Sequence, residues 1–297
     1  MRALVVTPGS PSGLALGEAP DPSPAPNEVL VEVRHSSLNF GDVNGAPNAA
    51  AGSVPGWDAS GVVVKPAEDG SGPGAGERVL SFGYAGGWAS LRAVPAKELA
   101  VVPAEVDLAV AAALPVAGVT ALRALRAAGP LLGRRVLVTG ASGGVGRYAV
   151  QLAALGGAHV VAAARRGEGL AELGADEVVA SLDGLAPVDA VLDNVGGRQL
   201  VHAFGLLAPG GSLQSVGWTS GEPAEFPVYG TVGPPKSLMS FQVGTEFGVD
   251  LAYLLDLVAA GRLTVDVGWR GSWRHFDEGV SALLGRKVAG KAILDHD

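Results

Sequence analysis

The residues with the clearest chemical meaning form a glycine-rich turn, Gly140 to Gly146, that reads Gly-Ala-Ser-Gly-Gly-Val-Gly. It follows an apolar run ending in Thr139, and a helix-like segment comes after it. At a strand-to-helix junction, backbone N–H groups and the helix dipole can hold a pyrophosphate. Gly143 allows close phosphate approach and Gly146 close helix packing, while Ala141 replaces the first glycine of the usual fingerprint. We therefore expect a dinucleotide site with contacts from Ser142, Gly143, Gly144 and Val145.

Two adjacent arginines, Arg165 and Arg166, follow the next predicted strand. A site that prefers NAD usually carries an acidic residue here, which binds the ribose hydroxyls. Two guanidinium groups can instead bind a 2′-phosphate, so the pair predicts NADPH as the cofactor. The alternative is that the pair is background, because arginine is far commoner than lysine in this chain.

Strands that alternate with helices must position these residues, and the sequence shows this pattern from about residue 115 onward. Several of the predicted strands are almost continuous apolar runs, as expected for strands buried on both faces. The pattern predicts an α/β fold with a doubly wound, parallel, six-stranded sheet. The expected strands are Arg134–Thr139, His159–Ala164, Glu177–Val179, Ala190–Asp193, Gly211–Val216 and Leu238–Val243. The expected helices include Val145–Leu155 and Phe247–Ala260.

The first 105 residues or so predict a β lobe, because they are rich in proline and glycine and contain short β-branched runs. Within this lobe Asn44–Pro55 reads as a loop with no core to bury. The last strand, Gly290–Leu294, is too short to stand alone, so we expect it to pair back onto the β lobe. This gives a discontinuous first domain, with residues 1–114 and 263–297 on either side of a nucleotide-binding domain at 115–262.

Composition excludes several classes of function. The chain has 297 residues, of which 48% are hydrophobic and 17% charged, enough to bury the cores of two domains. Its net charge of −8 argues against nucleic-acid binding. The absence of cysteine rules out disulfides and thiolate-bound metals and fits a reducing cytoplasm. No segment predicts a secretory signal or a membrane span.

With these features in place, the chain resembles the medium-chain dehydrogenase/reductase superfamily, and within it the zinc-independent quinone oxidoreductase branch with its enoyl reductase relatives. The resemblance implies a GroES-like lobe, a Rossmann lobe and a reaction cleft between them. Its carriers, in chain order, are Ser37–Asp42, Val54–Val63, Gly86–Ser90, Ala111–Ala121, the turn Ala141–Gly146 and the closing pair Gly290-Lys291.

The resemblance also implies roles for individual residues. Asn39 matches a ribose or nicotinamide-side contact, and Thr120 matches a neighbour of the cofactor. Further implied cofactor contacts are Asn194, Val195, Gly217, Trp218, Phe241 and Val243. Three tryptophans, Trp57, Trp88 and Trp218, are expected either to pack in the interior or to line the substrate cleft.

The chain departs from the zinc-dependent relatives at a telling position. Where they carry Gly-His-Glu, it has Gly56-Trp57-Asp58, and the cysteine ligands are absent. No histidine pair has the spacing of metal ligands, so we expect no metal. The segment after Asp42 also lacks the tyrosine that some enoyl reductase relatives place there.

Without a metal to stabilise an alkoxide, conjugate reduction is the favoured chemistry, because its developing charge is delocalised. The sequence therefore predicts an NADPH-dependent reductase of a quinone or of the activated C=C bond of an enone. In this reaction Asp42 either joins a proton relay or orients the loop of Asn39.

Two alternatives stay open. One is a dedicated ene reductase acting on a bulky, polyketide-like intermediate, and the other is a non-catalytic NADPH-binding protein with a structural or regulatory role. The apolar edge of the sixth predicted strand also indicates a homodimer.

Overall fold

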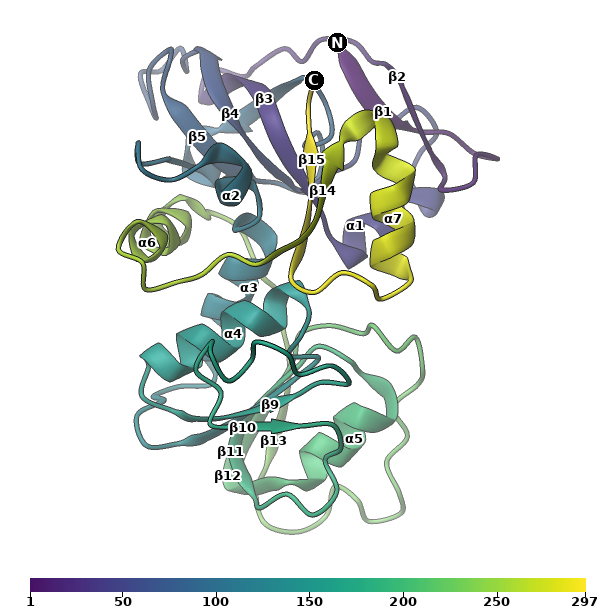
Figure 1. Cartoon of the computed structure of the whole chain (residues 1–297), viewed down its shortest axis with the longest axis vertical. Coiled ribbons are helices and arrows are strands. Elements are labelled where there is room, and N and C mark those ends of the chain that lie inside the picture. The colour runs from purple at the N-terminus through teal and green to yellow at the C-terminus, as the bar shows by residue number, and fades with distance from the viewer. The chain divides into compact units, whose positions relative to one another are not determined.

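A computed structural model describes all residues, Met1 to Asp297, and divides into two compact units (Figure 1). The first unit comprises Met1–Val119 and Thr245–Asp297, and the second comprises Thr120–Gly244. The divisions thus fall after residues 119 and 244 rather than after the expected 114 and 262. The difference arises because helix α6 (Gly248–Ala259) packs against strands of the first unit.

The second unit contains the parallel six-stranded sheet that the sequence predicts. Its strand order is β10-β9-β8-β11-β12-β13, and every neighbouring pair is parallel. This is the doubly wound arrangement, in which the strand order reverses direction beside β8. The strands are β8 (Arg135–Thr139), β9 (His159–Ala163), β10 (Glu177–Val179), β11 (Val188–Asp193), β12 (Leu207–Ser215) and β13 (Ser237–Ser240). The helices are α4 (Gly144–Leu155) and α5 (Gly197–Gly205), and α3 (Pro115–Ala127) crosses the division between the units.

The sixth strand is shorter than predicted. It ends at Ser240 instead of Val243, because β13 pairs only with β12 and that pairing stops at Ser215 opposite Ser240. The segment beyond it is fixed by side-chain contact instead, since Arg123 Nη1 donates to the Val243 carbonyl at 2.6 Å.

The first unit is built on a seven-stranded, mostly antiparallel sheet and a separate two-stranded ribbon of β1 (Arg2–Val6) and β2 (Leu14–Glu18). The large sheet consists of β3 (Glu28–Leu38), β4 (Asp58–Lys65), β5 (Arg78–Phe82), β6 (Leu91–Pro95), β7 (Leu99–Val101), β14 (Val267–Ser272) and β15 (Lys291–Asp295). The helical segments are α1 (Phe40–Gly45), η1 (Ala46–Asn48), η2 (Ala96–Glu98), α2 (Leu108–Ala112), η3 (Trp273–His275) and α7 (Phe276–Leu284), besides α6.

The end of the chain returns to this sheet, as predicted. Strand β15 lies beside β3 (Figure 1) and pairs with it antiparallel. Ala292 lies opposite Leu38 in this pairing. The β lobe is therefore discontinuous in sequence, and its last strand brings Lys291 next to the segment that follows β3.

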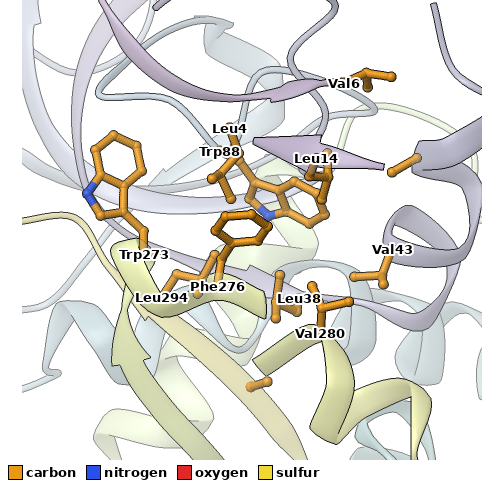
Figure 2. Close-up of a cluster of buried hydrophobic side chains, with 12 residues drawn as sticks. Leu4, Val6, Leu14, Leu38, Val43, Trp88, Trp273, Phe276, Val280 and Leu294 are labelled. Carbon is orange, nitrogen blue, oxygen red and sulfur yellow. The ribbon is translucent and has the colours of Figure 1, made fainter. Parts of the chain in front are cut away.

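One core of the first unit gathers apolar side chains from both ends of the chain (Figure 2). Trp88, Trp273 and Phe276 are its largest members, with Leu4, Leu38 and Leu294 around them. Ala46 also belongs to this core, which corrects the expectation that Asn44–Pro55 is a loop with nothing to bury. The first residues of the segment Asn44–Pro55 are helical, because Val43 and Ala46 share one buried face.

No helix combines the length and the apolar character that crossing a bilayer requires.

Candidate active site

The glycine-rich turn lies at the carboxyl end of β8, where it leads into helix α4. Gly143 is the N-cap of this helix and supplies no side chain to cap it, so the first N–H groups of α4 are not satisfied by a side chain. Gly140 has φ = +60°, a left-handed conformation that favours glycine. A Cβ on Gly146 would approach Ala141 Cα to 2.6 Å, which confirms the predicted close packing of helix against turn. The turn fits an anion such as a pyrophosphate.

Arg165 and Arg166 follow β9 and are both exposed. The loop after them is held by Arg147, a largely buried residue of α4 whose Nη1 donates to the Glu168 carbonyl at 3.3 Å. Sequence patterns do not single out Arg147, because its position in a helix says nothing about a partner loop. The arginine pair is thus presented by a loop that α4 itself supports.

The carboxyl ends of β8, β11 and β12 meet at one edge of the sheet. Asn194 donates from Nδ2 to the Thr139 carbonyl at 2.8 Å, and its backbone N–H donates to Thr139 Oγ1 at 3.1 Å. A Cβ on Gly217 would lie 2.9 Å from the Asn194 carbonyl oxygen. The structure therefore brings Asn194 and Gly217 together, while Val195, the next residue in the chain, is half-buried.

Buried Asp193 links the ends of β8 and β11 by hydrogen bonds. Its two carboxylate oxygens accept from Thr139 Oγ1 at 2.6 Å and from the Gly196 N–H at 2.7 Å. Burial raises the pKa of Asp193, and these hydrogen bonds oppose the shift. Asp193 thus fixes the loop that carries Asn194 and Val195.

The other predicted contacts of this unit are less closely grouped. Trp218 is 47% exposed, and its ring lies against Gly196, while Nε1 donates to the Glu222 carbonyl. Phe241 and Val243 are half-buried in the segment after β13, and Thr120 is buried in α3.

In the first unit, three ionisable side chains lie buried together. Asp58 is fully buried, and its Oδ2 accepts from Ser37 Oγ at 2.5 Å, from Asn39 Nδ2 at 2.9 Å and from Lys291 Nζ at 3.2 Å. Its Oδ1 accepts from the Val116 N–H at 2.9 Å. The Lys291 ammonium is only 3% exposed, so the ion pair is sealed from solvent. Buried ion pairs of this kind need further hydrogen bonds to be stable, and both oxygens of Asp58 accept them here.

Asn39 occupies the centre of this buried cluster. Lys291 Nζ donates to Asn39 Oδ1 at 2.5 Å, and an ammonium can only donate, so the facing atom must be the amide oxygen. Asn39 Nδ2 then faces the carboxylates of Asp58 and Asp42. The amide has one orientation, and both of its N–H donors are engaged within the protein.

Asp42 is the third ionisable side chain of this cluster and is 4% exposed. Its Oδ1 accepts from the Asn39 N–H at 2.8 Å, and its Oδ2 from Asn39 Nδ2 at 3.3 Å. Burial first, and then the negative charge of Asp58, raise its pKa to about 7, against the opposing effects of the Asn39 N–H and Lys291. Because both carboxylate oxygens face Asn39, the geometry favours the orienting role over the proton relay.

Sequence patterns do not mark Lys291 or Asp58 as site residues, since Lys291 lies 252 residues from Asn39 and 233 from Asp58. The signals that could have found them are two segments of the family resemblance, the Gly290-Lys291 pair for Lys291 and Val54–Val63 for Asp58.

The tryptophans divide into two groups. Trp88 is fully buried in the core of Figure 2 and donates from Nε1 to the Ser37 carbonyl at 3.0 Å, so of the two expected roles it has the packing one, and its assignment to the substrate cleft is corrected. Trp57 is half-buried, and its ring lies against Gly41.

The residues Gly56-Trp57-Asp58, which stand where the zinc-dependent relatives carry Gly-His-Glu, do not fit a zinc ion. An indole is not a zinc ligand, and both oxygens of Asp58 already accept hydrogen bonds. No group of three or more histidine, cysteine, aspartate or glutamate side chains is arranged to hold a metal.

Comparison with known proteins agrees with the two-unit architecture. The family described as "Alcohol dehydrogenase GroES-like domain" matches residues 25–104, and "Zinc-binding dehydrogenase" matches residues 144–260. The chain is 40% identical over 209 residues to the chloroplast envelope quinone oxidoreductase homolog of Arabidopsis thaliana. This match covers 64% of the chain and 63% of that relative, so it spans less than two thirds of the relative's length.

Two further comparisons span almost the whole chain. The acryloyl-coenzyme A reductase of Metallosphaera sedula is 26% identical over 345 residues, with 99% of both proteins covered. Mycobacterial Rv1454c, solved in complex with NADPH, has a TM-score of 0.90 and 26% identity, with 100% of both chains covered.

Proposed function

Because the chain belongs to the medium-chain dehydrogenase/reductase superfamily of oxidoreductases, we propose that it is an NADPH-dependent, zinc-independent reductase of a quinone or an enone C=C bond. The observation that carries this proposal is the glycine turn at the start of α4, with two exposed arginines after the neighbouring strand. The names of its quinone oxidoreductase and acryloyl-coenzyme A reductase relatives support the choice of acceptors.

NADPH, when bound, supplies a hydride to the acceptor. The N–H groups at the start of α4, from Gly144 and Val145, hold the pyrophosphate, with Ser142 and Gly143 beside it. Arg165 and Arg166 bind the 2′-phosphate by charge-assisted hydrogen bonds. The remaining proposed cofactor contacts are Asn39, Thr120, Asn194, Val195, Gly217, Trp218, Phe241 and Val243.

The choice of a conjugated acceptor follows from the side chains available. Reduction of an isolated carbonyl concentrates negative charge on one oxygen, which usually requires a metal or a positioned acid. In the first unit the buried acid, Asp42, is turned toward Asn39, and the buried lysine is paired with Asp58. In a quinone or enone the charge spreads over the conjugated system, so one hydrogen bond and a proton from water suffice.

The experiment that tests this function is a panel assay of NADPH oxidation. Quinones and enones should accelerate NADPH consumption well above background, while simple ketones with NADPH and simple alcohols with NADP⁺ should give no turnover. Elemental analysis of the dialysed, active protein should find no stoichiometric zinc. Turnover only of alcohols and ketones, or one zinc ion per chain, would overturn the proposal.

A further inference from the structure

Trp57 joins the buried cluster of the first unit to the protein surface. It directly precedes Asp58, and Gly41, which its ring contacts, lies between Asn39 and Asp42 in the chain. Asp58 and Asn39 are held from several sides by hydrogen bonds, so the two segments that flank this indole are fixed. A half-buried aromatic side chain on so rigid a base is suited to binding a ligand, because little conformational freedom is lost on contact.

The ring itself is held at two places. A Cβ on Gly41 would approach Trp57 Cη2 to 2.6 Å, so the outer edge of the six-membered ring lies directly on that glycine. The Tyr84 ring meets Trp57 edge-on, with centroids 6.1 Å apart at 76°. The Trp57 carbonyl also accepts from the Gly83 N–H at 3.1 Å, which ties its backbone to the segment that carries Tyr84.

The indole N–H of Trp57 has no acceptor within the protein and is not sealed from solvent. In contrast, Trp88, Trp218 and Trp273 each donate to a backbone carbonyl. Trp57 thus offers both an aromatic surface and an unused N–H donor.

We propose that Trp57 recognises the acceptor, stacking on a planar conjugated carbonyl compound such as a quinone and donating its N–H to the carbonyl oxygen. The inference rests on the proposed function and adds a substrate class, planar quinones in preference to small acyclic enones. A flat, rigid face contacts a fused-ring quinone over a larger area than it contacts a short enone chain.

The proposed step is balanced without any proton from Trp57. The hydride adds to the conjugated system, and its electron pair displaces a π pair onto the carbonyl oxygen. The indole N–H stabilises this oxygen by a hydrogen bond and keeps its own proton. Protonation by water then gives the hydroquinone, or the saturated ketone from an enone, so that one hydride and one proton have been added.

Three variants and one control separate the parts of this inference. Trp57→Phe keeps an aromatic face but removes the donor, and Trp57→Leu removes both. Gly41→Ala keeps the indole but pushes its edge away. Gly45→Ala is the matched control on the same short helix, because a Cβ there meets nothing within 4 Å.

Binding is measured without cofactor, as quenching of protein fluorescence by oxidised 9,10-phenanthrenequinone. Turnover is measured with NADPH and either this quinone or methyl vinyl ketone. Trp57→Phe should bind the quinone nearly as the parent does but lower kcat about 10-fold or more, since it lacks the donor. Trp57→Leu and Gly41→Ala should weaken quinone binding about 3- to 10-fold. Gly45→Ala should match the parent protein.

The outcomes distinguish this inference from the proposed function. If Trp57→Phe and Trp57→Leu bind and reduce the quinone as Gly45→Ala does, Trp57 is not the recognition residue, although the proposed function stands. If the parent binds the quinone through Trp57 but oxidises no NADPH with any acceptor, the recognition residue is right and the proposed function is wrong. Equal losses for the quinone and methyl vinyl ketone in Trp57→Leu would overturn the preference for planar acceptors.

Discussion

The candidate site of each unit is built from a different kind of group. In the second unit the chemistry comes from backbone, namely the glycines before α4 and the N–H groups of its first turn, all within one short stretch of chain. In the first unit it comes from side chains, with Asp58 and Lys291 buried together and Asn39 held between them. The N–H groups before and in the first turn of α4 are available to bind an anion. In the side-chain cluster, by contrast, Asp58 is already paired with Lys291.

This difference indicates different tasks. An anionic ligand stabilises a helix N-terminus that no side chain caps, so this part of the site contributes to cofactor affinity. A cluster whose buried charges are already paired and hydrogen-bonded gains little from a ligand, and disturbing it costs much stability. We therefore expect variants of the buried cluster to act through stability and positioning, and variants of the turn before α4 and of the arginine pair to act through cofactor affinity.

The largest effect should come from removing the buried cation. Lys291→Met leaves the Asp58 carboxylate buried without its ion partner, which should lower the free energy of unfolding by about 3–5 kcal/mol. Urea denaturation of Lys291→Met beside Lys287→Met, an exposed lysine on the same part of the chain, provides the comparison. If the two variants are equally stable, the buried ion pair does not stabilise the first unit.

The next effect concerns pH. The pKa of Asp42 is raised from 3.8 to about 7, so between these values the folded protein holds a proton that the unfolded chain releases. The resulting stabilisation is complete below pH 4 and is lost as the pH rises through 7. Relative to Asp42→Asn, the wild-type free energy of unfolding should fall by on the order of 4 kcal/mol across this window. A difference between the two that does not change with pH would show that Asp42 is not perturbed.

The arginine pair tests the second unit. Replacing Arg165 and Arg166 together with alanine should weaken NADPH binding by about 2–4 kcal/mol and leave NADH binding nearly unchanged, because only NADPH carries the 2′-phosphate. Titration calorimetry with each cofactor measures this, and Arg198→Ala, an exposed arginine of α5, is the control. Equal losses for NADPH and NADH would mean that the pair is structural.

The smallest expected effect is on dimerisation, and it should differ between the edge strands of the two large sheets. Leu238 and Met239 are 43% and 49% exposed on edge strand β13, and we propose that a second copy of the chain pairs there. Met239→Lys should shift a dimer toward monomer in light scattering, while Val267→Lys, on the other sheet's edge strand β14, should not. A wild-type monomer at micromolar concentration would exclude this pairing.

Prediction from the sequence succeeded where the cause was local. The turn before α4 and the apolar strands of the second unit were readable because a few adjacent residues determine them. The length of β13 was not, since it depends on how far β12 continues beside it. The contact between Asn39 and Lys291 could not be predicted either, because the two residues come together only through the pairing of β15 with β3. Trp88 and Trp57 could not be told apart, because the burial of a tryptophan depends on packing across the whole unit.

Hydride transfer to a conjugated acceptor is tested most directly by an isotope label. With deuterium at the transferring position of NADPH and an enone as acceptor, the label should appear on the β-carbon of the saturated ketone. The hydrogen on the α-carbon should come from solvent, because the enolate takes its proton from water. Mass spectrometry and NMR of the product locate both atoms. Deuterium on a carbinol carbon would show that the carbonyl itself is reduced and would contradict the account.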